Sequence, residues 1–316
     1  MAVASGLSLG RIRNRLTMTR RERRNLLLGL LFISPWLFGF ITLLVYPIVY
    51  SFALSFTRYS GFGDPQWICL DNYTRIVGDP LFWKSAWNTL FYTALAVPIG
   101  VAVAMAMALA MNTRVREVAV YRAALYLPSV LPIFALTFIF IVLLNPGFGL
   151  VNYVLRILGL GSGPDWIGDP DWTKPALVLL AQLGAGSIAL IFLAGLRNVP
   201  RELYESAEID GAGAWSRFRN ITLPMLTPLI LYDLIIGLSY GLQVFTQAYV
   251  MTAGGARAAG PDNSLLFYVF YIYKNAFQYT QMGYAEAMAV VLFIISLLLA
   301  FAVFRWARGW VYYEAA

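Results

Sequence analysis

The residues best suited to contact a partner lie in one polar segment, 205–224, between two apolar stretches. The segment reads E-x-A, three residues, Gly211, nine residues and I-x-L-P. Its acidic side chains, which suit a helix N-terminus and can pair with an arginine of a partner, are Glu205, Glu208 and Asp210. A solvated loop of two amphipathic helices would explain these charges, but not the run of small residues beside paired aromatic side chains. The pattern therefore indicates contact with a soluble partner.

We expect two helices in this segment, separated by a break at 211–213. Small residues around the break would let another surface approach closely, and Trp215 and Phe218 would anchor the second helix. Pro224 would open the next apolar stretch, because proline is tolerated in the first turn of a helix. The residues expected to make the contact are Glu205, Ser206, Ala207, Asp210, Gly211, Trp215, Phe218, Leu223 and Pro224.

A second group of polar residues lies within apolar stretches, where polar side chains are costly and usually face a cavity or a neighbouring helix. Four of them share one face of a predicted helix over 225–251: Asp233, Tyr240, Gln243 and Gln247. A ring and carboxamides suit a sugar, because the ring stacks on its C–H face and the amides hydrogen-bond its hydroxyls. The candidate substrate-pathway residues are Tyr240, Gln243, Gln247, Gln182 and Ser187.

The alternative is that these polar groups hold helices together or pair with another subunit, as buried amides in membranes commonly do. Both interpretations stay open for Tyr240 and Gln243. We expect Asp233, in the inner half of its helix, to be structural. For Glu286, at the outer end of its helix, a role in the pathway and simple solvation both stay open.

Composition identifies the elements that must position these residues as membrane spans. About 60% of the residues are apolar and 12% are charged, far from the quarter charged that is typical of soluble domains. Apolar runs of about 20 residues cross a bilayer, and we expect six, within 25–57, 86–111, 123–144, 176–196, 225–251 and 283–304. Two further stretches, 150–158 and 264–273, are too short to span, and we expect them to lie on the surface or to re-enter.

The distribution of basic residues predicts the orientation. With the N-terminus inside, the inner segments hold sixteen Lys and Arg residues and the outer segments hold seven. This bias favours cytoplasmic N- and C-termini. The expected organisation is a basic cytoplasmic segment 1–24, a transmembrane domain 25–306 and a cytoplasmic tail 307–316, with the loop 197–224 in the cytoplasm.

Residue types exclude several classes of chemistry. The chain has no histidine and one cysteine, Cys69, so imidazole and paired-thiolate metal sites are excluded. None of the three lysines follows a glycine, so a G-x-x-x-x-G-K-[ST] phosphate loop is absent and we expect no cofactor on this chain. With no histidine and a single cysteine, metal-dependent hydrolysis and cysteine nucleophile chemistry are excluded as well, so we expect no enzyme. The basic residues beside the spans indicate orientation in a lipid bilayer rather than nucleic-acid binding. The arginines between positions 20 and 24 resemble those of an export signal, but the apolar run after them is longer than the core region of such a signal. We therefore expect this run to be the first transmembrane helix.

The patterned loop and several further motifs resemble the permease subunits of binding-protein-dependent ABC importers, in the sugar-permease branch of maltose-permease type. The resemblance covers about residues 26–305. Beyond the loop, it is carried by Phe32-Ile33-Ser34-Pro35-Trp36, Tyr46-Pro47-Ile48, Asn88-Thr89-Leu90, Tyr126-Leu127-Pro128, Leu193-Ala194-Gly195-Leu196 and Thr252-Ala253-Gly254-Gly255. Two departures are Ser206, where alanine is more common, and Ala256, where proline is common.

This resemblance implies an all-α membrane protein with the type I ABC importer permease fold, in a prokaryotic inner membrane. It implies three protein partners: a second homologous permease, a dimeric ATPase that holds ATP and Mg, and an extracellular solute-binding protein. Glu205 would be the ionic contact with the ATPase, Gly211 the helix break, and Trp215 and Phe218 would fill an apolar pocket. ATP would close the ATPase dimer, pull the docked loops together and drive alternating access of a carbohydrate.

Two alternative functions stay open. A permease of the same family could carry glycerol phosphate or another small polar solute, although the spans offer no cation to hold a phosphate. An ion-coupled secondary carrier would need ionisable groups deep in several spans. Asp233 is the only strong candidate for such a group.

Overall fold

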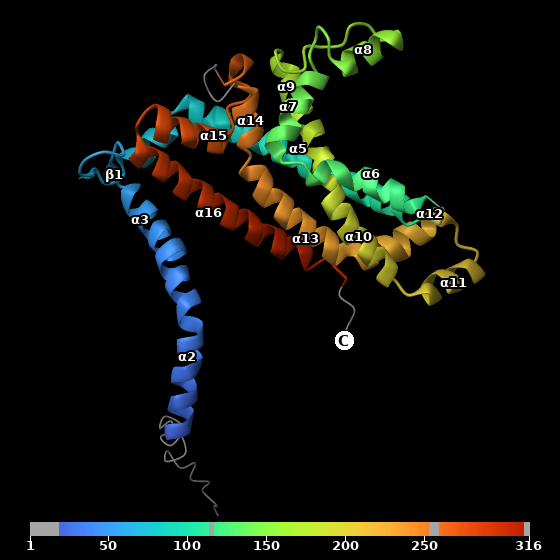
Figure 1. Ribbon diagram of the computed structural model, residues 1–316, viewed down its shortest axis with the longest axis horizontal. Coiled ribbons are helices and arrows are strands. Elements are labelled where there is room, and N and C mark those ends of the chain that lie inside the picture. The colour runs from blue at the N-terminus through green and yellow to red at the C-terminus, as the bar shows by residue number, and fades with distance from the viewer. Residues whose placement is uncertain (1–18, 114–116, 253–258, 313–316) are drawn as a thin grey trace, which may run out of the picture. The chain divides into compact units, whose positions relative to one another are not determined.

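The structure is a computed structural model that describes residues 19–113, 117–252 and 259–312. The chain divides into two compact units, Met1–Ala53 and Leu54–Ala316, and each is described by itself (Figure 1). Within the described residues, five helical stretches are long and apolar enough to cross a membrane, and one bent helix pair makes a sixth. The six predicted spans therefore correspond to five such stretches and one bent pair.

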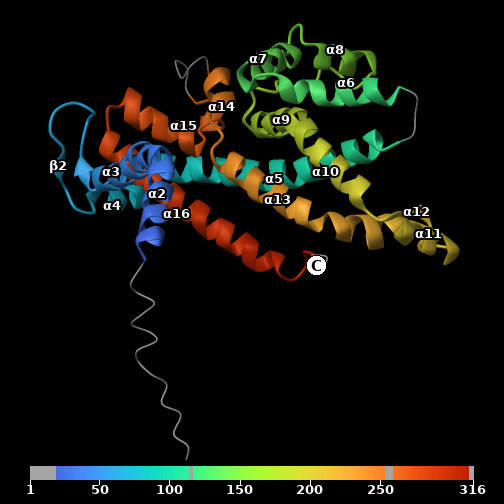
Figure 2. The ribbon, with the colours of Figure 1, turned by 60° about the horizontal axis from the view of Figure 1, so that its bottom comes forward.

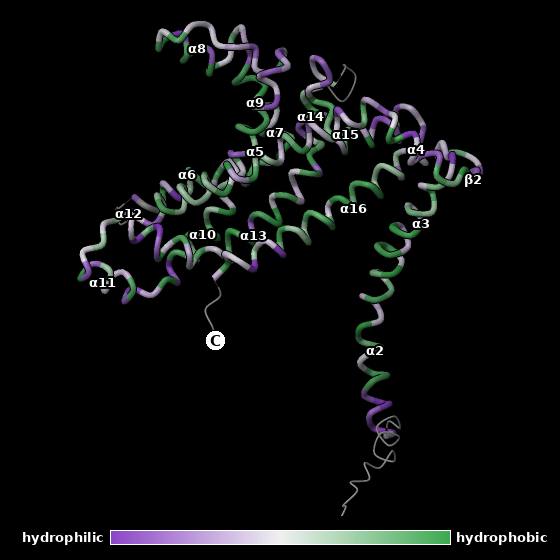
Figure 3. Tube along the Cα trace, turned by 180° about the vertical axis from the view of Figure 1, so that it is seen from behind, coloured by the Kyte–Doolittle hydropathy of each residue, from purple (hydrophilic) through white to green (hydrophobic). Residues whose placement is uncertain are grey.

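The described part of the first unit is helical. α2 (Arg20–Phe40), η1 (Ile41–Val45) and α3 (Tyr46–Leu54) follow one another as a single stretch that continues to the first residue of the second unit. A capping box at Thr19 satisfies the first backbone N–H groups of α2. The π-helical turn η1 ends just before Pro47, whose ring removes a backbone donor. Along α2, hydrophilic residues lie at the start of the helix and apolar residues follow them (Figure 3).

The second unit begins with a short hairpin. β1 (Thr57–Arg58) pairs antiparallel with β2 (Gln66–Trp67), and α4 (Asp71–Gly78) follows. The buried Asn72 amide of α4 donates to the carbonyl oxygens of Ser55 and Thr57, both at 2.9 Å. The first helical stretch ends at Leu54, inside the predicted range 25–57, and Thr57 already belongs to the hairpin.

α5 (Pro80–Met111) is the helix around which the second unit is built. It packs against α9 (Pro170–Gln182), α10 (Gly186–Asn198) and α13 (Leu223–Leu242), as Figures 1 and 2 show. Small residues permit these close crossings, as is common between membrane helices. Ala108 is fully buried, and a Cβ added at Gly241 of α13 would lie 2.8 Å from the Thr93 side chain.

Three spans are interrupted along their length. α6 (Val118–Val130) and α7 (Ile133–Leu143) meet at a bend of 100°, at Leu131–Pro132. The predicted span 123–144 therefore corresponds to a bent helix pair and not to one straight helix, because proline cannot continue the helical hydrogen bonding there. A 3₁₀ turn, η2 (Leu183–Ala185), joins α9 to α10, and residues 243–245 separate α13 from α14 (Thr246–Met251).

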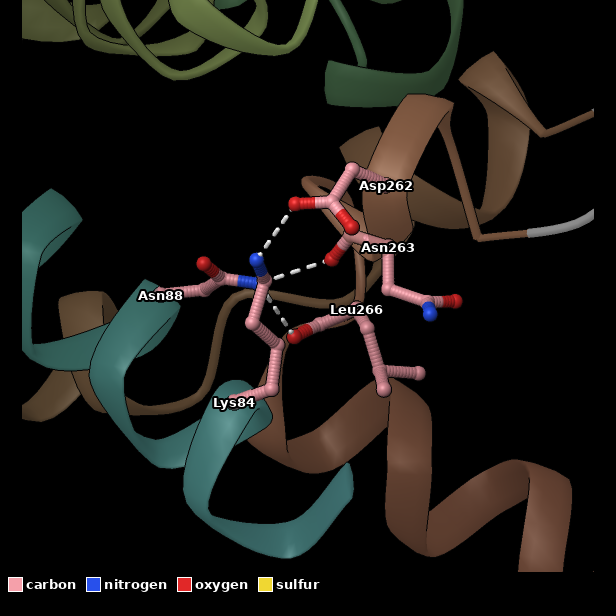
Figure 4. A network of polar contacts seen from close by, with 5 residues as sticks. All are labelled: Lys84, Asn88, Asp262, Asn263 and Leu266. Carbon is pink, nitrogen blue, oxygen red and sulfur yellow. Dashed lines mark hydrogen bonds and ion pairs between the residues drawn. The ribbon is translucent and has the colours of Figure 1, made fainter. Parts of the chain in front are cut away.

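The described residues 259–281, which precede α16 (Met282–Ala307), are held against α5. They contain η4 (Pro261–Asn263), α15 (Tyr268–Tyr273) and η5 (Lys274–Gln278). The buried Asn88 amide of α5 donates to the carbonyl oxygens of Asn263 at 2.9 Å and Leu266 at 3.0 Å. Lys84, one turn earlier, forms an ion pair of 2.8 Å with Asp262 (Figure 4).

One of our two interpretations of the stretch 264–273 placed it on the surface, and the structure contradicts that one. Phe267 and Phe270 are fully buried, and the backbone N–H of Tyr268 donates to the Thr89 hydroxyl at 2.8 Å. In contrast, 150–158 forms α8 (Leu150–Ile157), which is largely exposed as expected.

α11 (Arg201–Ile209) and α12 (Ala214–Arg217) lie at the opposite end of the second unit from α15 and the hairpin (Figure 1). We call this end the loop end. The C-terminal residues also reach the start of α13, because the backbone N–H of Tyr312 donates to the Thr227 hydroxyl at 2.9 Å.

Candidate functional site

The loop at 205–224 contains the two helices and the break that its sequence predicts. α11 ends in a turn with Gly211 at φ +74°, a backbone conformation that favours glycine. The N–H of Ala212 donates to the carbonyl of Ala207 at 2.8 Å, and that of Gly211 to Glu208 at 3.0 Å. These two bonds form a Schellman motif, which closes a helix C-terminus.

The acidic residues do not lie at a helix N-terminus, contrary to our expectation. α11 begins at Arg201, directly after Pro200, so Glu205 and Glu208 fall within the helix and Asp210 caps its end. Glu208 forms an ion pair with Arg217 of α12. The ion pair joins the two loop helices, so Glu208 has a partner within its own chain.

The loop presents apolar side chains to its surroundings. Ile209 is 87% exposed and Trp215 is 71% exposed. Trp215 stacks on the half-buried Phe218 with ring centroids 5.5 Å apart. Glu205 and Ser206 are also exposed, whereas Leu223 and Pro224 are half-buried. Exposed large apolar groups beside charges are typical of a surface that binds another protein.

The second loop helix is continuous with the span that follows. α12 runs through the π-helical turn η3 (Phe218–Thr222) into α13, and Pro224 lies in the first turn of α13. The Tyr204 hydroxyl of α11 hydrogen-bonds the Thr222 hydroxyl at 2.8 Å. The loop is thus attached to α13 by unbroken helix and by a side-chain contact.

A cavity of about 630 Å³ lies among α5, α9, α10 and α13, where the interrupted spans meet. Its wall includes Ile133 just after the bend, Gly184 in η2, and residues 243–246 at the third interruption. Irregular backbone at membrane depth is tolerated where it faces protein or a cavity. Val97 and Gly100, near the middle of the 32-residue α5, also line it. The cavity therefore lies near the middle of the membrane spans.

All five predicted substrate-pathway residues line this one cavity: Tyr240, Gln243, Gln247, Gln182 and Ser187. We predicted that these residues of 240–247 share one face of a single helix. This was only partly right, because the interruption at 243–245 places Gln247 on a different helix, α14. Tyr240 is 76% exposed, so its ring is available for stacking.

One of the amides, that of Gln182, also joins two helices, so the two interpretations of such residues are not exclusive. The Gln182 amide donates to the carbonyl oxygens of Val178 at 2.7 Å and Ala96 at 3.4 Å. The Gln243 amide donates to the Ser239 hydroxyl at 3.2 Å. Among the described residues, Gln182 Oε1 has no hydrogen-bond partner.

The sequence interpretation did not include Asp233 among the substrate-pathway residues. Asp233, expected to be structural, lines the wall and is 8% exposed. The signal was present in the sequence, since an ionisable residue within a span is a functional candidate by default. Glu286 is half-buried and makes an interaction, so it is not simply solvated.

Some predicted features lie outside the described residues. These are the N-terminal basic segment up to residue 18, Ala253, Gly254, Gly255 and Ala256 of the motif after the fifth span, and the last four residues of the tail.

Comparisons with known proteins agree with this arrangement. The chain matches the family described as "Binding-protein-dependent transport system inner membrane component" over residues 96–311. It is similar to the "Probable ABC transporter permease protein YesP" of Bacillus subtilis, with 36% identity over 298 residues that cover 94% of this chain and 96% of that protein. The "Arabinooligosaccharides transport system permease protein AraP" of the same organism is 34% identical over 273 residues, covering 85% of each chain.

A solved structure shares the fold. It is described as a bacterial ABC transporter involved in the import of the acidic polysaccharide alginate, and one of its chains superimposes with a TM-score of 0.76. The identity is 24%, over 91% of this chain and 96% of that chain.

Proposed function

The chain belongs to the family of binding-protein-dependent transport system inner membrane components, and we propose that it moves a mono- or oligosaccharide into the cell as the permease subunit of an ATP-driven importer. It is a multi-pass membrane protein with the fold of an ABC importer permease. The single observation that carries the proposal is the convergence of a tyrosine ring and carboxamides on one mid-membrane cavity.

The chemistry of the cavity supports a sugar as substrate. Tyr240 offers an exposed ring, and Gln243, Gln247 and Gln182 offer amides. A ligand site of this kind is largely apolar with a few placed polar groups. Similar proteins named for arabinooligosaccharides and for lactose support the same substrate class.

The loop supports coupling to a separate ATPase subunit that holds ATP and Mg. Glu205 would make the ionic contact, and Trp215 with Phe218 would enter an apolar pocket of the ATPase. Because α12 continues into α13 as one helix, a displacement of the loop would tilt the wall of the cavity at Asp233 and Tyr240. The interruption at 243–245 would absorb the tilt, as hinges do at a few element-terminal residues.

The remaining partners follow from this mechanism. A second homologous permease would complete the pathway, and an extracellular solute-binding protein would deliver the sugar. The loop end and both termini would face the cytoplasm, as the distribution of basic residues predicts.

A second candidate is an ion-coupled carrier, favoured by one observation. Asp233 is buried at the cavity wall, as a proton- or ion-binding carboxylate would be. This candidate gives no role to the exposed aromatic side chains of the loop.

The experiment that tests the importer is purification of the chain in detergent from its host, followed by assay for a bound ATPase. We expect the wild-type chain to retain an ATPase subunit and Glu205→Ala to lose it. The matched control is Glu117→Ala, an exposed acid at another turn between spans, which should retain it. Absence of any ATPase from the wild-type preparation would contradict the proposal.

A further inference from the structure

The cavity carries one charge. Of the described residues that line it, Asp233 is the only one with an ionisable acidic or basic side chain, apart from the tyrosines. In the part of the chain that the structure describes, no lysine or arginine lines the wall. Within the described chain, the Asp233 carboxylate has no ion pair or hydrogen bond to any residue. Within the described residues, no cation or hydrogen-bond donor of the protein therefore offsets the charge of the ionised carboxylate.

The position of Asp233 makes its charge effective over the cavity. It precedes Tyr240 by seven residues on the same helix, which is about 10 Å along the axis. An uncompensated charge in a cleft of low polarity acts over this distance more strongly than in water. A solute at Tyr240 and Gln243 would therefore experience the field of the carboxylate.

We propose that Asp233 is a specificity-determining residue that excludes anionic solutes from the cavity, so that the chain carries uncharged sugars and not sugar acids, sulfonates or phosphates. A negative solute is repelled by Asp233 and finds no cation in the wall. The hydroxyls of an uncharged sugar can donate hydrogen bonds to the carboxylate and to the amide oxygens of Gln243 and Gln247, which line the same wall. This inference rests on the proposed function of the cavity as a sugar pathway.

The test measures the electrostatic preference of the cavity directly. Ser187 is exposed in the cavity wall and is replaced by cysteine, in a Cys69→Ser background. Its reaction rate is compared for two methanethiosulfonate reagents, one with a trimethylammonium group and one with a sulfonate group, at low salt. Each reagent forms a mixed disulfide with the cysteine and releases methanesulfinate.

We expect the cationic reagent to be favoured over the anionic one, and Asp233→Asn to reduce this ratio by about fourfold or more. Fourfold is the effect on this ratio of one charge in bulk water at about 10 Å, the distance along α13 from Asp233 to Tyr240 in the same cavity wall, and a less polar cavity increases it. Native Cys69, which is exposed and outside the cavity wall, is the control, and its ratio should not change with Asp233→Asn.

Two results would overturn the proposal. One is an unchanged ratio in Asp233→Asn. The other is failure of both Ser187→Cys and a second cavity reporter, Thr246→Cys, to react, which would show that solutes do not reach this wall. The measurement needs neither ATPase nor binding protein. If only the importer proposal is wrong, the purified chain carries no ATPase, but the ratio of the two reaction rates still depends on Asp233.

Discussion

Glu208 of α11 forms an ion pair with Arg217 of α12 across the turn at Gly211. The pair holds together the two short helices that present Ile209 and Trp215. Together with the hydrogen bond between Tyr204 and Thr222, it makes the loop a preformed unit rather than a flexible connection.

The first prediction concerns this ion pair. Because the Glu208 side chain is 61% exposed, the pair contributes at most about 1 kcal/mol, so Glu208→Gln or Arg217→Gln should weaken ATPase association by about fivefold or less. The double exchange Glu208→Arg with Arg217→Glu should recover most of the loss. Titration of the purified ATPase against each variant measures this. Complete loss of association in either single variant would mean that the residue contacts the ATPase directly.

The second prediction concerns Trp215. It is 71% exposed, so Trp215→Ala should leave the folded chain intact. Buried tryptophans at interfaces commonly contribute 2 kcal/mol or more, so ATPase affinity should fall by about 30-fold. The matched control is Phe301→Ala on α16, a residue that is 69% exposed but far from the loop in sequence. Equal affinities for Trp215→Ala and wild type would remove Trp215 from the docking surface.

The third prediction concerns the buried hydrogen bonds of α5. Asn88→Ala removes the donor to two buried carbonyl groups and should cost about 1–3 kcal/mol. Lys84→Met, which breaks the neighbouring exposed ion pair, should cost less than about 1 kcal/mol. Thermal unfolding in detergent would compare them. A larger loss for Lys84→Met than for Asn88→Ala would contradict this ranking.

The fourth prediction concerns acid stability. Burial raises the pKa of Asp79, but hydrogen bonds from the hydroxyls of Tyr271 at 2.6 Å and Tyr284 at 2.7 Å outweigh it, so the pKa lies below its ordinary value of 3.8. A lowered pKa means that the ionised group stabilises the folded protein above pH 3.8, and that this contribution is lost as the pH falls through the folded-state pKa.

As the pH falls below 3.8, the midpoint of thermal unfolding should therefore drop more steeply in the wild type than in Asp79→Asn. The control Asp64→Asn, at an exposed position of the hairpin loop, should follow the wild-type curve. Parallel curves for Asp79→Asn and wild type would show that Asp79 does not contribute in this way.

Local features of the fold could be predicted from the sequence. The break at Gly211 depends on one glycine and its neighbours, and the Schellman turn forms there. The pathway residues at 240–247 could be found because polar groups within an apolar helix must face a cavity or a partner. The start of α11 was missed although Pro200, directly before it, is a signal for a helix boundary.

Features that depend on distant contacts could not be predicted. The burial of 264–273 depends on Asn88, 175 positions before its partner Asn263. The cavity depends on three interruptions in separate spans, and only the one at Pro132 has a proline at the break. The exposure of Asp233 to this cavity follows from the same packing.

The most direct test of the account is uptake of labelled oligosaccharides by proteoliposomes that contain the importer complex purified with this chain. We predict that uptake requires ATP inside the vesicles, is lost with Glu205→Ala and falls strongly with Tyr240→Ala. Uptake that proceeds without ATP, follows an imposed proton gradient and disappears with Asp233→Asn would contradict the account and identify an ion-coupled carrier.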